Sequence, residues 1–157
     1  MKTSLALVFS AFAVMPVCGQ TQFLKPKGLP PAHGYSHVVV AKPGRLVFIS
    51  GQTASGPDGR LVGKGDLKAQ TTQVFENLKV ALAAAGASFD DVVKIGWYIK
   101  DYRPEDLSTL RDVRNRYINS ETPPASTLVG VQMLFDPDLL LEVDSIAVVP
   151  ENRPAQK

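Results

Sequence analysis

One stretch restricts the possible fold of this chain more than any other. It comprises residues 122–149, TPPASTLVGVQMLFDPDLLLEVDSIAVV. Two apolar runs flank the turn-forming sequence Phe135-Asp136-Pro137-Asp138, so the stretch predicts two β-strands joined by a turn. Glu142 stands in the second run as its lone acid, where desolvating a carboxylate is costly unless a partner pairs with it. We therefore expect both the edge of the core and a candidate site in this stretch.

Two other segments have the apolar spacing of amphipathic helices. Asp66 can cap a helix over residues 67–85 whose apolar side chains share one face, and Gly86 can end it in the left-handed conformation. Pro104 predicts the start of a second helix that continues to about residue 119.

Three further segments have the composition of strands. Residues 37–41 and 46–50 are rich in β-branched and apolar side chains, and the Pro-Gly turn at residues 42–45 between them predicts a β-hairpin. Residues 91–100 alternate with the period of a half-buried strand. The predicted order is therefore β-β-α-β-α-β-β.

This order predicts one α+β domain over residues 33–150, with a mixed sheet and two helices on one of its faces. The opposite sheet face would still show apolar side chains, which favours cover by another subunit. Residues 20–32 are rich in proline and predict an extended lead-in. Residues 151–157 are expected to form a C-terminal tail.

The first residues have the pattern of a secretory signal peptide at 1–19. A basic start precedes an apolar run at 5–14 that is shorter than the about 20 residues a membrane span needs, and Val17 and Gly19 suit the −3 and −1 cleavage positions. We expect a periplasmic or secreted protein that is not membrane-bound after cleavage. The alternatives are a lipoprotein modified at Cys18 and a buried N-terminal strand.

Charge and motif content exclude several functions. The formal net charge of +2 comes from 17 basic and 15 acidic residues, which argues against nucleic-acid binding. His33 and His37 are four residues apart, but Gly34 and the upstream prolines oppose a helix there, so no metal site is expected. The chain also lacks a G-x-S-x-G nucleophile turn and the glycine spacing of a phosphate loop. Neither a metal nor another cofactor is predicted.

Three features are candidates for a small-molecule site. Tyr35 brings a phenol to the start of the first strand, Ser50 and Gly51 form a bend where a ligand can approach the backbone, and Glu142 supplies an acid. Each also has a structural interpretation: a core tyrosine, a β-bulge and an ion pair with a neighbouring subunit.

Together these residues resemble the RidA/YjgF family, whose members act as enamine/imine deaminases. The resemblance extends over about residues 33–149. It rests on the segments Ile49–Gln52, Gln70–Leu78, 85–88, 91–94, Pro124-Ala125 and Leu141–Asp144. It implies a chorismate-mutase-like fold and a homotrimer that binds its ligand in clefts between subunits.

In active members of this family, an arginine after the Pro-Ala pair binds the substrate carboxylate, and a glutamate on the last strand holds the attacking water. The resemblance assigns the glutamate's role to Glu142, with Tyr35, Ser50 and Gly51 as substrate-binding residues. An arginine suits the first role because its planar guanidinium binds a carboxylate through two parallel hydrogen bonds.

The chain departs from this pattern at Ser126, which holds the arginine's position and is followed by Thr127 and Leu128. Losing a charge-assisted hydrogen bond would weaken carboxylate binding by about 1.5–3 kcal/mol. On the second helix, Arg111 stands where the family has an asparagine. Arg111 or Arg114 would then supply the carboxylate-binding guanidinium from a different position, unless both are ordinary solvent-facing residues.

Two functions follow. The first is a metal- and cofactor-free hydrolase of small imines, with Glu142 as the catalytic, water-positioning residue. The alternative is a non-catalytic trimer that binds a small ligand or another protein, which the missing arginine and the predicted export both favour.

Overall fold

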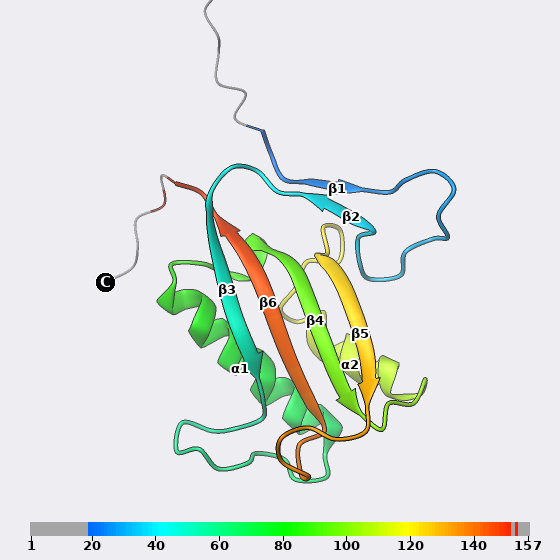
Figure 1. Cartoon of the computed structure of the whole chain (residues 1–157), viewed down its shortest axis with the longest axis vertical. Coiled ribbons are helices and arrows are strands. Elements are labelled where there is room, and N and C mark those ends of the chain that lie inside the picture. Colours follow the sequence, from blue (N-terminus) through cyan, green and yellow to red (C-terminus); the bar gives the residue numbers. More distant parts are fainter. Residues whose placement is uncertain (1–18, 152, 154–157) are drawn as a thin grey trace, which may run out of the picture.

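The computed structural model describes residues 19–151 and residue 153. The predicted signal peptide, apart from Gly19, lies outside the described residues, as does most of the predicted tail. The elements run in the order β1 (Gln22–Leu24), β2 (Val38–Val40), β3 (Arg45–Gln52), α1 (Leu67–Ala84), the 3-10 turn η1 (Phe89–Asp91), β4 (Val92–Lys100), α2 (Asp106–Arg114), β5 (Ala125–Val131) and β6 (Leu141–Val149) (Figure 1).

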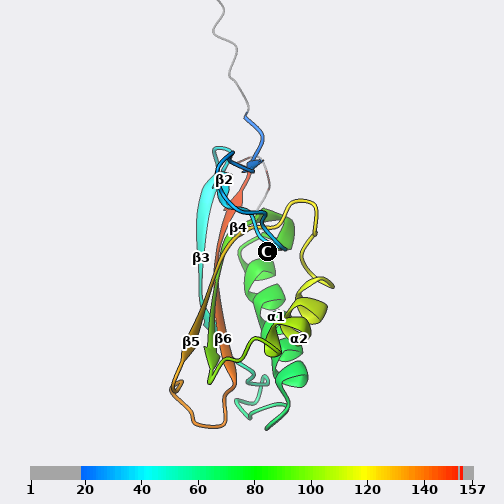
Figure 2. The same cartoon turned by 90° about the vertical axis from the view of Figure 1, so that its right-hand side faces the viewer.

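The main sheet has four strands in the order β3-β6-β4-β5. The pairs β3–β6 and β4–β6 are antiparallel, whereas β4 and β5 are parallel. Both helices cover the same face of this sheet, and the other face is open (Figure 2). The prediction of an α+β fold with a mixed sheet and two helices on one face is confirmed.

The predicted hairpin between the first two strands is wrong. β2 instead pairs antiparallel with β1 in a separate two-stranded sheet, with Leu24 opposite Val38. β3 pairs with β6, which matches its length and offers a continuous apolar partner, whereas β2 has only three residues. The proline-rich lead-in therefore contributes a strand of its own.

Helix α1 has the caps that the sequence predicts. The Asp66 carboxylate accepts a hydrogen bond from the backbone N–H of Ala69 at 3.0 Å. Gly86 follows the last turn with a φ of 69°, a conformation that glycine adopts without strain. The second helix ends at Arg114 and is therefore shorter than predicted. Beyond this residue the backbone tightens into turns, because the N–H of Arg116 donates to the carbonyl of Val113, three residues back.

Aromatic rings fill the core between the helices and the sheet. Phe75 of α1 is fully buried, and its ring centroid lies 5.7 Å from Phe89, 5.5 Å from Trp97 and 5.1 Å from Tyr117. Leu110 of α2 is buried in the same cluster. The core thus joins both helices to β4, the strand beside the edge strand β5.

The open sheet face is apolar and exposed, as predicted. Phe48 is 72% and Leu46 58% exposed on β3, and Tyr98 and Val129 continue the same surface across β4 and β5. A surface of this kind favours burial against another chain.

A buried glutamine ties α1 to the chain just before β6. The Gln70 side chain donates hydrogen bonds to the carbonyls of Gly63 at 3.2 Å and Asp138 at 2.9 Å. It also accepts one from the backbone N–H of Leu140 at 2.8 Å. All of these partners are backbone groups, so Gln70 fixes the position from which β6 starts.

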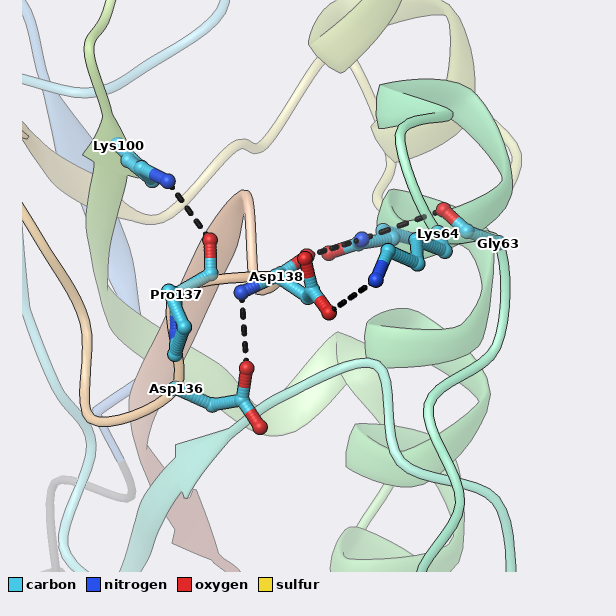
Figure 3. A network of polar contacts seen from close by, with 7 residues as sticks. Gly63, Lys64, Lys100, Asp136, Pro137 and Asp138 are labelled. Atoms are coloured by element: carbon cyan, nitrogen blue, oxygen red, sulfur yellow. Dashed lines mark hydrogen bonds and ion pairs between the residues drawn. The ribbon is translucent and has the colours of Figure 1, made fainter.

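Two lysines bind the turn at residues 135–138, which precedes β6 (Figure 3). Lys64 forms an ion pair with Asp138 at 2.6 Å, and Lys100 donates to the carbonyl of Pro137 at 2.7 Å. Within the turn, the backbone N–H of Asp138 donates to the Asp136 carboxylate at 2.8 Å. The predicted turn at residues 135–138 is therefore confirmed as a compact structure.

We expect Gln70→Ala to lower the free energy of unfolding by about 2–4 kcal/mol, because it leaves buried backbone groups without partners. Urea unfolding followed by circular dichroism measures this change. Gln73→Ala, which removes one hydrogen bond to Asn77 from the same helix, is the matched control and should cost less than about 1 kcal/mol. Equal losses in the two variants would contradict the structural role of Gln70.

Candidate functional site

The predicted site residues lie on two opposite faces of the sheet. Ser126 and Leu128 of β5 pair in register with Ile95 and Trp97, which belong to the core on the helical side. Thr127 lies between them and accepts a hydrogen bond from Lys94 on the open side. Successive residues of a strand point to opposite faces, so this edge strand contributes to both sides.

On the helical side, a pocket of about 350 Å³ opens between β5 and α2. Its walls are mainly apolar and aromatic and include Tyr35, Trp97 and Tyr102. Its polar lining residues are His33, Arg111, Arg114 and Ser126, beside the hydroxyl-bearing Tyr35 and Tyr102. The pocket thus brings together Tyr35, Arg111, Ser126 and Leu128 of the predicted site, together with Arg114.

Tyr35 reaches this pocket because its neighbour Ser36 is fixed to the start of β5. The Ser36 hydroxyl donates to the carbonyl of Pro123 at 2.6 Å, and its backbone N–H donates to the carbonyl of Pro124 at 3.1 Å. Ser36 also forms a parallel bridge with Ala125. The sequence alone does not predict this contact, because the two segments are almost ninety residues apart.

Both arginines of the pocket are anchored to the segment before Tyr35. Arg114 donates to the carbonyl of Gly34 at 2.7 Å, and Arg111 donates to the carbonyl of His33 at 3.3 Å. Gly34 has a φ of 79°, and an added Cβ would lie 2.5 Å from Nη2 of Arg114. Glycine is therefore required both by the backbone and by the close approach of the guanidinium.

The charge in this pocket is not neutralised by any acid among residues 19–151, since neither arginine has a carboxylate within ion-pair distance there. Burial lowers the pKa of Arg114, and the positive charge of Arg111 lowers it further. The interpretation of both residues as ordinary solvent-facing arginines does not fit these positions.

On the open side, Glu142 lies against the bend of β3. An added Cβ at Gly51 would overlap Oε1 of Glu142, so only glycine lets the carboxylate take this place. The bend comes from a register shift between Ile49 and Gln52 in the β3–β6 pairing. Ser50 is exposed at the same bend. The structure thus brings Ser50, Gly51 and Glu142 together.

The prediction that Glu142 is the lone acid of its strand is wrong. Asp144 lies two residues further on and on the same open face, next to Gly96, where an added Cβ would be 2.6 Å from its Oδ1. Tyr98 donates a hydrogen bond to Asp144 at 3.1 Å, and this bond and the negative charge raise the pKa of Tyr98. The sequence contains a signal for this second acid, because two residues that are two positions apart in a strand lie on the same face.

Within the described part of the chain, no three His, Cys, Asp or Glu side chains gather as a metal site would require. The helices described are also too short or too polar to cross a membrane.

The sheet order, the single helical layer and a pocket at the sheet edge define a chorismate-mutase-like α+β protein. The sequence profile of the family described as Endoribonuclease L-PSP matches residues 26–149. A RutC family protein of Pyrococcus abyssi is 38% identical over 117 residues, which cover 74% of this chain and 87% of that protein. The chain belongs to the RidA/YjgF family.

Two further relatives extend this comparison. The crystal structure of YyfB from Yersinia pestis, a Rid family protein of unknown function, has a TM-score of 0.76 and 35% sequence identity, and the match covers 83% of this chain and 100% of that one. A 2-iminobutanoate/2-iminopropanoate deaminase of Dermatophagoides farinae is 31% identical over 119 residues, or 76% of this chain and 88% of that protein.

Proposed function

We propose that this protein hydrolyses a small imine or enamine in a cleft between the subunits of a homotrimer. The observation that carries the proposal is the Glu142 carboxylate, held against the bare backbone of Gly51 on an apolar open face. The relative named as an iminobutanoate/iminopropanoate deaminase supports the same reaction class.

In the proposed reaction, Glu142 accepts a proton from a water molecule as the water oxygen bonds to the imine carbon. Glu142 returns this proton to the nitrogen, which also receives the proton of the newly formed hydroxyl group. The carbon–nitrogen bond then breaks as the carbonyl forms, and ammonia leaves. No electron is exchanged with an outside partner. A general base of this kind contributes about 10²–10⁴-fold to the rate.

The separation between the pocket beside Ser126 and the Glu142 carboxylate supports an assembly of several copies of the chain. In one protomer, the Ser126 pocket and Glu142 lie on opposite faces of the sheet, so neither can reach a ligand bound at the other. A second copy whose β5 edge packs on the open face would bring its own pocket beside the first copy's Glu142. The exposed Phe48 and Leu46 are suited to such a contact.

The proposal is tested by adding purified protein to imino acids released by an amino-acid oxidase. Ammonia release should be faster than in buffer, and light scattering should give the mass of a trimer. An unchanged rate with every charged and uncharged imine, in a protein whose melting temperature still rises with small acids or amides, would contradict the hydrolase and favour the binding trimer.

Ser126→Arg should raise kcat/KM for the smallest imino acid, derived from 2-aminoacrylate, by about ten- to a hundredfold. The reason is that a guanidinium here adds a charge-assisted bond, of about 1.5–3 kcal/mol, to a substrate that leaves most of the pocket empty. Ser126→Gln is the control, since it adds length and donors without charge. An equal gain in both variants would show that the added length and donors, rather than the charge, cause the gain.

A further inference from the structure

We propose that Arg111 and Arg114 bind the carboxylate of the substrate, and that the pocket beside them selects imino acids with a large apolar or aromatic side chain. This inference rests on the proposed function, because it names the substrate class of the same site. It assigns to α2 the role that Ser126 on β5 cannot fill.

Arg111 and Arg114 are three residues apart and therefore lie on one face of α2, the face that also brings Leu107 and Leu110 to the pocket. By contrast, Arg116 lies just beyond this helix and is exposed. The two guanidinium groups thus enter the pocket together with the apolar wall of the helix.

The two arginines differ in how many N–H donors their hydrogen bonds within the protein use. A guanidinium has five N–H donors. Arg114 uses its donors on the carbonyl of Gly34 and the side-chain oxygen of Asn115, whereas Arg111 makes one long hydrogen bond, to the carbonyl of His33. Arg114 is therefore the fixed positive charge, and Arg111 keeps donors for a bidentate contact with a carboxylate.

Two neighbouring cations of a partly buried pocket repel each other when no acid of the described residues pairs with them. A bound carboxylate would remove this repulsion and would not compete with an internal ion pair. The pocket is therefore prepared for an anion rather than for a neutral amide.

The apolar part of the pocket can hold the remainder of the ligand. The pocket volume of about 350 Å³ is within the range of small-molecule sites, about 300–1,000 Å³. Trp97, Tyr102, Leu110 and Leu128 line it with apolar surface. A ligand that holds its carboxylate at α2 can bury an aliphatic or aromatic side chain against these residues. An imino acid as small as 2-aminoacrylate would leave that surface unfilled.

Equilibrium binding tests this inference without turnover. The probes are phenylacetate, the neutral phenylacetamide of the same shape, and acetate, which lacks the ring. In calorimetry, phenylacetate should bind at least tenfold more tightly than either of the other two. Arg111→Gln and Arg114→Gln should each weaken phenylacetate by about ten- to a hundredfold, with little effect on phenylacetamide. The control Arg116→Gln should bind all three probes as the wild type does.

Two more variants keep the test decisive if Arg114→Gln does not fold. Arg111→Lys keeps the charge but loses the planar fork, and should give an intermediate affinity. Gly34→Ala removes no charge, yet its Cβ displaces the Arg114 guanidinium, and should weaken phenylacetate as well.

The possible failures are separable. Equal affinities of the wild type for phenylacetate and phenylacetamide, or unchanged phenylacetate binding in the folded arginine variants, would overturn this inference even if small imines are hydrolysed. Tight phenylacetate binding without hydrolysis of any imine would support the inference about the ligand and overturn the proposed reaction alone.

Discussion

Glu142→Gln should lower kcat for imine hydrolysis by about 10²–10⁴-fold while the affinity for phenylacetate stays unchanged. Glutamine keeps the shape of the side chain, but its amide cannot accept the proton that the attacking water must lose. The measurement is ammonia release at saturating imine, with calorimetry on the same preparation. A variant that keeps more than half of the wild-type rate would show that Glu142 is not the base.

Two companion variants separate the carboxylate's position from its charge. Gly51→Ala leaves Glu142 in the sequence but occupies the space of its carboxylate, so it should also lose most of the hydrolysis rate. Asp144→Asn removes the other acid of the same strand face, whose partner is Tyr98, and should change kcat by less than about tenfold. Comparable losses in Asp144→Asn and Glu142→Gln would point to a general effect of negative charge on this face.

Phe75→Ala should lower the free energy of unfolding by about 3–5 kcal/mol. The ring is fully buried and contacts three other aromatic rings, from η1, β4 and the segment after α2, so its removal leaves a cavity that α1 alone cannot close. Urea unfolding at a fixed protein concentration measures the loss, since any assembly makes stability concentration-dependent. Val80→Ala, at an exposed position of the same helix, should change the stability by less than about 0.5 kcal/mol. Similar losses in both variants would contradict the assignment of the core.

Local sequence signals predicted the elements well where the signal and the cause lie in the same segment. The apolar spacing of residues 67–85, with Asp66 before them and Gly86 after them, predicted α1 and both of its ends. The alternation in residues 91–100 predicted β4. The predicted hairpin failed because strand pairing depends on a partner elsewhere in the chain, here β6 for β3 and β1 for β2.

The candidate site shows the same division. Glu142, Tyr35 and the Ser50–Gly51 bend were found from residue type and resemblance, and the membership of the RidA/YjgF family is confirmed. Trp97 and Tyr102 were not predicted to line the pocket, because nothing in their own segments relates them to α2. The signal peptide, the export and the trimer stay predictions.

By itself, the sequence determined the helices, most strands and the family, and it singled out Glu142 as the candidate acid, since these depend on local periodicity and on residue type. Only the tertiary structure decided that Ser126 and Glu142 lie on opposite faces of one sheet, and that Arg111 and Arg114 share a pocket with Ser126. The reason is that the face a side chain occupies is set by the register of strands far apart in the chain, which a segment cannot specify alone.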